Sequence, residues 1–328
     1  MKKTLITGGA GYIGTHTVRY FIEAGVKPSD IVVFDNLING NRNLLPDNVT
    51  FVKGDLLNKS VIEQVFKTYS IENVIHFAAY AYVGESLQNP GKYFENNVLG
   101  GLNLLNAMRG GDCFEIIFSS TCSTYGIPET LPIKEDTVQK PVNPYGESKL
   151  MFERILSWYA VIYGIRSINL RYFNAAGAGY GIGECHNPET HLIPLVIRAA
   201  ISGEPVLNVF GTDYDTADGT CVRDYIHVKD LAAAHYKALG RLAQSKQLTE
   251  SFNLGTGKGA SVRDVIKYVE MVSGLKVPYV EKARRLGDPA VLVADAAKAG
   301  EYLNWTPMFN LENIIKDAWE WHNREAKK

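Results

Sequence analysis

The chain has 328 residues, of which 46% are hydrophobic and 21% charged, so it can bury a substantial core and is neither a disordered tail nor a small disulfide scaffold. Its 34 lysines and arginines balance 35 aspartates and glutamates, which leaves no basic surplus for a nucleic-acid backbone. No apolar run approaches the ~18 residues of a membrane span, and the brief apolar stretch after the first lysines is too short for a signal peptide. We therefore expect a cytoplasmic protein with no nucleic-acid or membrane partner.

Apolar or β-branched runs alternate with segments of helical periodicity through the first half of the chain. The predicted strands are Thr4–Thr7, Ile31–Phe34, Val49–Val52, Asn73–Phe77, Phe114–Phe118 and Arg166–Leu170. Strands that are apolar throughout are typical of parallel sheets covered by helices on both faces. The sequence therefore predicts an α/β fold with a doubly wound parallel sheet of the Rossmann type. Ser60 and Glu63 further predict a capping box at the start of one crossover helix.

The pattern changes after Asn174, where a stretch rich in glycine, proline, histidine and aspartate runs to Tyr225. We expect a dinucleotide-binding domain over residues 1–174 and a smaller C-terminal α/β substrate lobe over residues 175–328. Later strand-like and helical runs occur at Phe252–Leu254 and Val262–Val272. They indicate that the chain returns to the first domain near residues 226–256.

Gly8, Gly9, Gly11 and Gly14 follow the first predicted strand and open a helix, with G-x-G-x-x-G spacing from Gly9. Without a Cβ the backbone can approach a pyrophosphate, whose charge then lies on the N-terminal amides of the helix. Asp35 ends the second strand, where a carboxylate accepts hydrogen bonds from a ribose diol and repels a 2′-phosphate, which favours NAD over NADP. The alternatives are a glycine-rich turn without a ligand and an Asp-Asn turn at Asp35.

Tyr145 and Lys149 lie four residues apart, so one turn of helix places them on the same face. A tyrosine with a pKa of ~10 is only about 0.1% ionised at pH 7, and using it as a base requires about 4 kcal/mol. A nearby lysine and a positively charged nicotinamide could supply this stabilisation. Thr121 closes the fifth strand and is the candidate for orienting a substrate hydroxyl. The alternatives are a core tyrosine beside a solvated lysine and a threonine that caps a strand.

Together these residues resemble the extended short-chain dehydrogenase/reductase family, and within it the UDP-glucose 4-epimerases (UDP-galactose 4-epimerases). The motifs that carry the resemblance span nearly the whole chain: Thr7–Gly14, Phe34–Leu37, His76–Ala78, Val83–Ser86, Asn96–Val98, Phe118–Thr121, Tyr145 with Lys149, Arg171–Asn174 and Asp218–His227. Dehydratases of the family place Asp-Glu after the threonine, whereas Cys122-Ser123 follows it here. Loss of water is therefore disfavoured.

The resemblance implies NAD as cofactor and a UDP sugar as substrate. The implied cofactor-binding residues are Gly8, Gly11, Tyr12, Ile13, Gly14, Asp35, Asn36, Asn39, Asp55, Leu56, Phe77, Ala78, Ala79, Asn96, Ser119, Tyr145, Lys149 and Tyr172. The implied substrate-binding residues are Thr121, Tyr145, Phe173, Asn174, His191, Leu192, Asn208, Val209, Phe210, Arg223, Arg285, Asp288 and Leu292.

Roles also follow from the resemblance. Thr121 and Tyr145 act on the sugar, and Lys149 holds the nicotinamide ribose and lowers the tyrosine pKa. Arg223 and Arg285 hold the diphosphate, which guanidinium groups match with charge-assisted bonds, and Asp288 contacts the nucleotide ribose. For Arg223 the alternative is a structural ion pair with its neighbour Asp224.

The implied activity is NAD-dependent interconversion of UDP-glucose and UDP-galactose. The C4 hydroxyl is oxidised, the 4-keto sugar rotates, and the hydride returns to its other face. The alternatives are 4-epimerisation of UDP-N-acetylglucosamine, UDP-glucuronate or UDP-xylose, and a non-catalytic nucleotide-sensing protein, which would not need Thr121, Tyr145 and Lys149 together. Ala81 stands where many relatives carry a cofactor-contacting lysine, and Leu292 where relatives place a residue that limits sugar size.

Two further expectations concern metals and assembly. The cysteines, Cys113, Cys122, Cys185 and Cys221, are widely spaced, which predicts reduced thiols. Cys185, His186 and His191 could be metal ligands, but their loop resembles the family's uracil-side segment, so we expect no metal. The helical stretches Tyr93–Met108 and Leu150–Ile162 carry apolar residues on more than one face: Val98, Leu102, Leu105, Ile155, Trp158 and Ile162. These two stretches predict a homodimer, as in the family.

Overall fold

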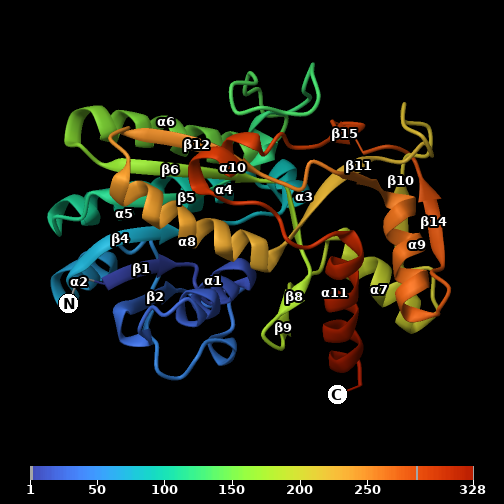
Figure 1. Cartoon of the computed structure of the whole chain (residues 1–328), viewed down its shortest axis with the longest axis horizontal. Helices are drawn as coiled ribbons and strands as arrows, with labels where there is room; N and C mark the ends of the chain where they lie inside the picture. The colour runs from blue at the N-terminus through green and yellow to red at the C-terminus, as the bar shows by residue number, and fades with distance from the viewer. Residues whose placement is uncertain (1–2, 286, 328) are drawn as a thin grey trace.

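A seven-stranded parallel sheet forms the larger part of the molecule in the computed structural model, which describes residues 3–285 and 287–327 (Figure 1). Its strands are β1 (Lys3–Thr7), β2 (Ile31–Asp35), β3 (Thr50–Lys53), β4 (Ile71–His76), β5 (Glu115–Thr121), β6 (Arg166–Tyr172) and β12 (Thr249–Leu254). Their order is β12-β6-β5-β4-β1-β2-β3. The direction of winding reverses between β1 and β4, and ligands bind at such switch points in doubly wound sheets.

Helices cover both faces of this sheet. Helices α1 (Tyr12–Glu23), α8 (Val228–Gln244) and α10 (Ala297–Leu303) pack with one hydrophobic cluster, and α2 (Lys59–Thr68), α5 (Gly100–Gly110) and α6 (Pro144–Tyr163) with another. Consecutive strand residues alternate between the clusters: Ile6 and Val33 belong to the first, Leu5 and Val32 to the second. Because the pleat turns successive side chains to opposite faces, strands covered on both faces must be apolar throughout. The predicted sheet class is therefore confirmed.

One local prediction in the first half of the chain is wrong, and one predicted helix differs in helix type. Helix α2 begins at Lys59 with Asn58 as its N-cap, so Ser60 lies within the first turn and donates to Asn58 Oδ1 at 2.9 Å instead of forming a capping box. The helix predicted over Tyr93–Met108 is divided into α4 (Pro90–Tyr93), the π-helical turn η3 (Phe94–Leu99) and α5.

Asn97 in the π-helical turn forms hydrogen bonds with two other segments of the chain. Asn97 accepts a hydrogen bond from the Tyr80 amide at 2.9 Å and donates to Ser148 Oγ of α6 at 3.0 Å. This turn therefore ties the loop after β4 to the helix that carries Tyr145, and the preceding α3 (Val83–Gln88) packs against the same helix.

The smaller lobe is built around a third hydrophobic cluster on the right of Figure 1. Its strands pair as β10 (Leu207–Phe210) with β14 (Tyr279–Lys282), β8 (Ala178–Gly179) with β9 (Ile182–Gly183), and β11 (Val222–His227) with β7 (Asn174–Ala176), β13 (Gly259–Ser261) and β15 (Val291–Leu292). Its helices are α7 (Leu192–Ser202), α9 (Val262–Ser273) and α11 (Leu311–Glu325), and the short 3-10 turns of the chain are η1 (Pro28–Asp30), η2 (Arg42–Leu44) and η4 (Cys122–Thr124). Between these lobe segments, α8 and β12 complete the large sheet domain.

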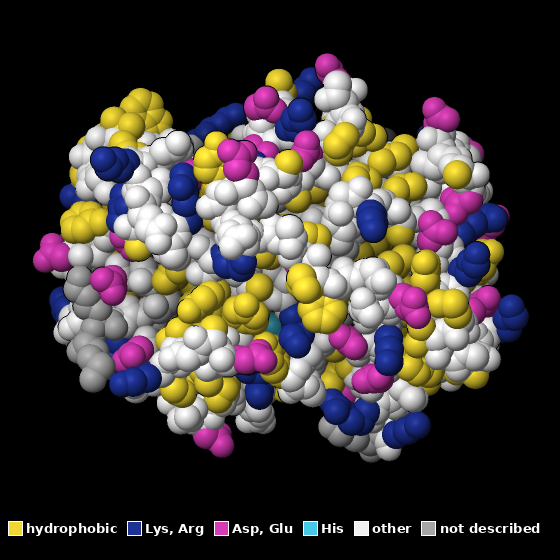
Figure 2. Space-filling view, in the orientation of Figure 1, with side chains coloured by type: hydrophobic (Ala, Val, Ile, Leu, Met, Phe, Trp, Pro, Cys, Tyr) yellow, Lys and Arg dark blue, Asp and Glu magenta, His cyan; other side chains and the backbone are white. Residues whose placement is uncertain are grey.

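The surface carries both signs of charge. Figure 2 shows lysine and arginine side chains interspersed with aspartate and glutamate over the visible face, as the balanced composition requires. Within residues 3–285 and 287–327 no helix combines the length and apolar character needed to cross a membrane.

Candidate active site

The glycine loop lies between β1 and α1 at the switch point of the sheet. Gly8 has a φ of +69°, and a Cβ there would lie 2.5 Å from the Ala78 amide nitrogen. A Cβ on Gly14 would lie 2.4 Å from the Gly8 carbonyl oxygen, so neither position can carry a side chain without moving backbone. Gly11 caps α1 without a side-chain hydrogen bond. The first-turn amides therefore have no side-chain cap, which is the arrangement that binds a phosphate anion.

Asp35 lies beside this loop at the end of β2. Its buried carboxylate accepts hydrogen bonds from the Ala10 amide at 3.0 Å and from the Leu37 amide at 2.8 Å. The bond to Leu37 is that of the Asp-Asn turn that was the alternative interpretation, and the bond to Ala10 attaches the same carboxylate to the glycine loop. Burial raises the pKa of Asp35, while the two amide donors oppose the increase.

Two cavities border these residues. One, of about 250 Å³, is enclosed by the glycine loop, residues 38–41 and residues 183–187, and it includes Tyr12 and Asn39. The other, of about 270 Å³, includes Asp55 and Asn96. Asp55 Oδ2 also accepts a hydrogen bond from Asn36 at 2.9 Å. Six of the expected cofactor-binding residues, Tyr12, Asp35, Asn36, Asn39, Asp55 and Asn96, are thus found around these two cavities and the end of β2.

Thr121, Tyr145 and Lys149 meet where β5 ends against the start of α6. Asn143 caps α6 through a hydrogen bond from the Gly146 amide at 2.8 Å, which fixes Tyr145 in the first turn. The Tyr145 hydroxyl is hydrogen-bonded to Thr121. Lys149 Nζ lies 6.0 Å from the Tyr145 ring centroid and donates to the Ser119 carbonyl at 2.8 Å. The three side chains expected to act together are therefore adjacent and buried.

Burial dominates the electrostatics of this group. It raises the pKa of Tyr145 to about 12, although the hydrogen bond with Thr121 opposes the increase. It also lowers the pKa of Lys149 to about 7, against the attraction of the Glu153 carboxylate. In the chain without ligands, burial thus disfavours the charged forms of both groups. That Lys149 lowers the tyrosine pKa stays a prediction for the complex with cofactor and substrate.

Glu153 is a functional neighbour that the sequence interpretation missed. It lies one turn beyond Lys149 and forms a buried ion pair with Arg171, with Nη2 to Oε2 at 2.6 Å and Nε to Oε1 at 3.0 Å. It also accepts a hydrogen bond from Ser120 at 2.5 Å. This pair fastens α6 to β5 and β6. The four-residue spacing from Tyr145 through Lys149 to Glu153 was a signal that could have revealed it.

Arg223 pairs with Asp288 in this structure. The alternative pairing with Asp224 is wrong, because Asp224 is buried and accepts from the amides of Thr256 at 2.8 Å and Gly257 at 3.0 Å. The guanidinium of Arg285 lies 4.0 Å from the ring centroid of Phe210. These side chains come from β10, β11 and the segment after β14.

Other expected substrate residues belong to two different hydrophobic clusters, one next to Thr121 and one in the smaller lobe. Leu292 is buried in one cluster with Phe173 and Cys122, and Cys122 directly follows Thr121. In contrast, Val209 faces the core of the smaller lobe, and Leu192 packs against that core. His191 interacts with Glu184 and Glu189; burial lowers its pKa, but the two carboxylates outweigh this effect and raise it to about 10.

Comparisons with known proteins agree with this geometry. The model of the family described as NAD dependent epimerase/dehydratase family matches residues 4–255. The chain is 48% identical to a UDP-glucose 4-epimerase of Halalkalibacterium halodurans, over 97% of this chain and 95% of that protein. A crystal structure of UDP-glucose 4-epimerase from Brucella ovis in complex with NAD superposes with a TM-score of 0.93 at 45% identity, covering 98% of this chain and 99% of that one. The enzyme from Bifidobacterium longum in complex with NAD+ and UDP gives a TM-score of 0.93 at 37% identity, with 99% of each chain covered.

Proposed function

This chain belongs to the NAD dependent epimerase/dehydratase family, and from that membership we infer that it interconverts UDP-glucose and UDP-galactose by 4-epimerisation with NAD as cofactor. The observation that carries this conclusion is the buried group of Thr121, Tyr145 and Lys149 at the end of β5 and the start of α6. The likeness to UDP-glucose 4-epimerases extends over nearly the full chain, so it includes the substrate lobe as well as the cofactor domain. Epimerisation of UDP-glucose is therefore favoured over that of the other UDP sugars.

The glycine loop fits a dinucleotide. Gly8 and Gly14 have no room for a Cβ, and the uncapped first turn of α1 supplies amides for the pyrophosphate. Asp35 has one carboxylate at the end of β2 that can accept from a ribose diol and repel a 2′-phosphate, which favours NAD over NADP. When bound, NAD supplies the acceptor and donor of the hydride at C4 and a positively charged ring.

Tyr145 is the proposed base and acid for the C4 hydroxyl proton. Starting from a pKa of about 12, ionising it at pH 7 costs roughly 7 kcal/mol. A protonated Lys149, whose Nζ lies 6.0 Å from the centroid of the tyrosine ring, offsets part of this cost. The remaining stabilisation must come from Thr121 and from positive charge in the assembled complex. Tyr145 therefore becomes a base only when cofactor and substrate are in place.

The substrate lobe has to hold the nucleotide while the sugar ring rotates. We propose that Arg223 and Arg285 bind the diphosphate and that Asp288 binds the nucleotide ribose. Arg223 and Asp288 form an ion pair, so UDP must share or displace this pair when it binds. Holding the diphosphate leaves the sugar ring free to present either face to the same catalytic residues.

The activity is tested by incubating the chain and NAD with UDP-galactose and following UDP-glucose formation by NMR. Tyr145→Phe should lower kcat by about 100-fold to 10,000-fold while leaving folding and NAD binding intact, because only the proton-transfer group is removed. Tyr159→Phe, on the same helix, is the matched control and should keep wild-type activity. Absence of UDP-glucose in the wild-type reaction would overturn the proposed function.

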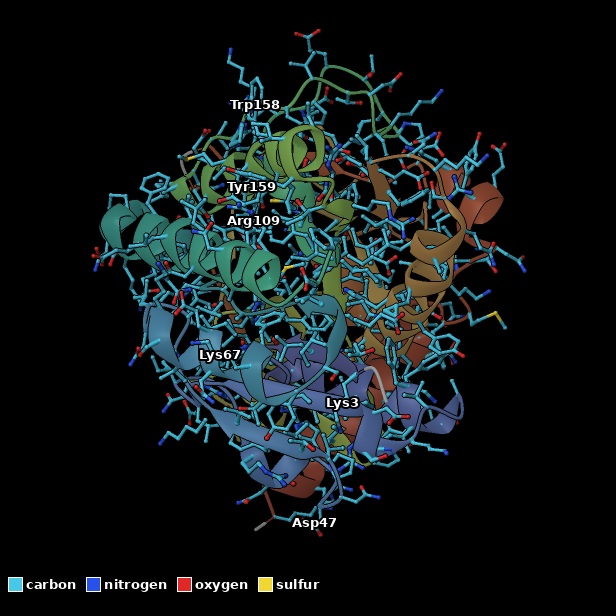
Figure 3. All side chains as sticks on the ribbon, turned by 90° about the vertical axis from the view of Figure 1, so that its left-hand side faces the viewer. Lys3, Asp47, Lys67, Arg109, Trp158 and Tyr159 are labelled. Atoms are coloured by element: carbon cyan, nitrogen blue, oxygen red, sulfur yellow. The ribbon has the colours of Figure 1, made fainter. Side chains whose placement is uncertain are left out.

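We further propose that two copies of the chain form a homodimer through α5 and α6. One side of α6 buries Phe152, Leu156 and Ala160, while Trp158 and Ile162 face outward with 67% and 61% of their surface exposed. Figure 3 shows Trp158, Tyr159 and Arg109 together on this face, where Arg109 stacks on Tyr163 at 3.6 Å. An exposed apolar face of this kind supports association with a second copy.

We also place the protein in the cytoplasm, with a role in galactose metabolism. All four cysteines are free, and three of them, Cys113, Cys122 and Cys221, are buried. Unpaired thiols support a reducing compartment.

A further inference from the structure

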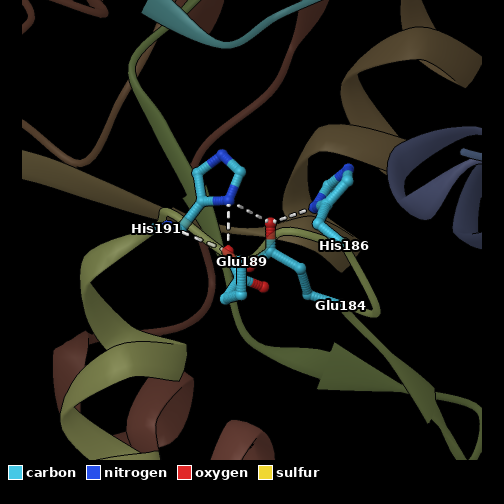
Figure 4. Close-up of side chains that lie close together, drawn as sticks. All are labelled: Glu184, His186, Glu189 and His191. Atoms are coloured by element: carbon cyan, nitrogen blue, oxygen red, sulfur yellow. Dashed lines mark hydrogen bonds and ion pairs between the residues drawn. The ribbon is translucent and has the colours of Figure 1, made fainter. Parts of the chain in front are cut away.

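Four potential metal ligands converge in the loop between β9 and α7 (Figure 4). Glu184, His186, Glu189 and His191 each offer one ligand atom, and all four atoms lie within 4.8 Å of one another. His191 Nδ1 lies 2.9 Å from Glu184 Oε1 and 2.8 Å from Glu189 Oε1. His186 Nδ1 lies 2.9 Å from Glu184 Oε1.

The two carboxylates are strongly buried for groups of like charge. The side chain of Glu184 is 5% exposed and that of Glu189 is 2% exposed. Among the described residues no lysine or arginine forms an ion pair with either of them. Buried carboxylates need a counter-charge, and in the chain without a cation it comes from His191, whose pKa the two carboxylates raise to about 10. A cation that binds here takes the place of that proton. One divalent cation bound by two carboxylates and two neutral imidazoles gives a net charge of zero.

The donor geometry fits a small transition-metal ion. Ligand atoms at ~2.0 Å from a tetrahedral zinc lie ~3.3 Å apart. The three separations of 2.8 and 2.9 Å therefore need to widen by a few tenths of an ångström, and the wider separations, which lie within 4.8 Å, need to narrow. Nitrogen and carboxylate ligands together suit zinc and its neighbours, whereas calcium and magnesium prefer oxygen alone. Glu189 is already fixed, because its Oε1 accepts from the amides of Thr190 and His191, each at 2.8 Å.

Tyr82 provides a second, independent observation at the same place. Its ring centroid lies 5.6 Å from that of His186 and 6.2 Å from that of His191. Its hydroxyl is buried without a hydrogen-bond partner among the described residues. A water molecule on a bound cation would satisfy this hydroxyl.

We propose that Glu184, His186, Glu189 and His191 form a binding site for one divalent first-row transition cation, with Zn²⁺ as the preferred ion. The expectation of no metal rested on the resemblance of this loop to the family's uracil-side segment, and the metal ligands considered there were Cys185, His186 and His191, without the two glutamates. Cys185 is exposed and is not a member of the cluster. The residues that complete the site are Glu184 and Glu189, which precede and follow Cys185 in the sequence.

The proposed metal site lies beside the cavity that borders the glycine loop. His186 lines the cavity of about 250 Å³, and its ring lies edge-on to Tyr12 with centroids 6.5 Å apart. Tyr12 opens α1 and donates to the Gly177 carbonyl at 2.6 Å. A cation here would hold the loop of the smaller lobe against the start of α1. Its consequence for NAD binding rests on the proposed function, whereas the metal site itself does not.

The test is to treat the purified full chain with a chelator and then titrate Zn²⁺ by calorimetry. We expect one Zn²⁺ per chain with a Kd in the micromolar range or tighter, and a higher Tm when Zn²⁺ is bound. Co²⁺ as a second probe should give the intense visible absorption of a tetrahedral or five-coordinate site. These readouts need neither NAD nor substrate, so failure of the metal site is distinguishable from failure of the proposed activity.

Three variants assign the ligands. His186→Ala and Glu184→Gln should each weaken Zn²⁺ binding by about 100-fold or more and remove the Co²⁺ absorption. Cys185→Ser is the matched control in the same loop and should bind Zn²⁺ like the wild type. If Glu184→Gln fails to fold, the partly exposed His186 still decides the question. No binding at micromolar Zn²⁺, unchanged binding in His186→Ala, or loss of binding in Cys185→Ser would overturn the proposal.

Discussion

At the scale of the residue, the active site is defined by groups whose charged forms are disfavoured until ligands arrive. Tyr145 is kept protonated by burial, which raises its pKa to about 12. Lys149 is held near the point of losing its proton, with a pKa of about 7. Each therefore changes protonation in response to a neighbouring charge, which is what a proton-transfer site requires.

The lowered pKa of Lys149 predicts how stability depends on pH. In the unfolded chain the lysine binds its proton up to about pH 10.5, whereas in the folded chain it releases it near pH 7. The unfolded state thus binds more protons between these values, so the free energy of unfolding should rise with pH by about 3 to 5 kcal/mol from this group. His191, whose pKa is raised to about 10, contributes a change of opposite sign over the same range. The Lys149 contribution is therefore measured as the difference between NAD-free wild type and Lys149→Met in urea unfolding at pH 7 and pH 10.

Lys149→Met isolates this contribution, because it retains the volume of the side chain without its charge. The free energy of unfolding of the wild type minus that of Lys149→Met should become more positive as the pH rises over the same range. A difference that stays constant from pH 7 to pH 10 would show that Lys149 is not buried as a poorly ionised group. Above pH 10 the tyrosines of the unfolded chain ionise before Tyr145, and stability should fall again.

Leu292 is expected to set sugar size. It is packed with Phe173 and Cys122, and Cys122 directly follows Thr121. We expect a leucine here to occupy volume that an N-acetyl group would need. We expect UDP-glucose and UDP-galactose to be the best substrates, with N-acetylated UDP sugars turned over more weakly. Leu292→Ser should raise kcat/KM for the N-acetylated pair selectively, and Leu292→Tyr should suppress it.

The comparison requires kcat/KM for both sugar pairs in wild type and both variants. Ile133→Ala provides the control, because Ile133 is buried in the same cluster and is not expected to contact the sugar. It should change both pairs alike. Equal changes for both pairs in the Leu292 variants would mean that this residue does not line the sugar pocket.

At the scale of the element, α6 joins the proposed catalytic residues to the sheet. Tyr145, Lys149 and Glu153 follow one another at four-residue intervals, and Glu153 pairs with Arg171 of β6. Removing one partner of a buried ion pair leaves the other without a counter-charge and costs about 3 to 5 kcal/mol. We therefore expect Glu153→Gln to lower the free energy of unfolding by about 3 kcal/mol.

Urea denaturation measures this loss, with Glu147→Gln on the same helix as the control, for which we expect a change below about 0.5 kcal/mol. Equal stabilities of the two variants would contradict the role given to the Glu153–Arg171 pair. We also expect Glu153→Gln to lower the epimerase activity, because α6, which carries Tyr145, would no longer be fixed against β5.

The sequence alone predicts the elements of the sheet well. Each expected strand from Thr4–Thr7 to Phe252–Leu254 overlaps an observed one, because burial on both faces leaves a continuous apolar run. The errors occur where local spacing competes with distant contacts. The π-helical turn depends on Asn97 reaching Tyr80 and Ser148, and the partner of Arg223 is Asp288 rather than its neighbour Asp224.

The same distinction applies to the candidate site. Thr121, Tyr145 and Lys149 could be predicted because each belongs to a local motif at a strand end or on a helix face. The Glu184, His186, Glu189 and His191 group could not, because its convergence depends on the path of the loop between β9 and α7. Spacing in that loop drew attention to Cys185, which is exposed and does not belong to the group.

At the scale of the whole molecule, the exposed apolar face of α6 predicts self-association. Trp158→Glu should convert the homodimer to a monomer at micromolar concentration, because a buried carboxylate would have no partner across the interface. Val138→Glu is the control, since Val138 is 78% exposed and lies outside α5 and α6. Light scattering measures the mass, and a monomeric wild type would count against the proposed dimer.

Hydride transfer within one bound cofactor is the central claim about the whole molecule. An epimerase returns the hydride it removes, so the label at C4 should remain there and the cofactor should show no net change. The most direct measurement is therefore to incubate the chain and NAD with UDP-glucose deuterated at C4 and to analyse the products by NMR and absorbance. We predict UDP-galactose that retains deuterium at C4 and no accumulation of free NADH. Stoichiometric NADH release, or loss of the deuterium, would contradict the account.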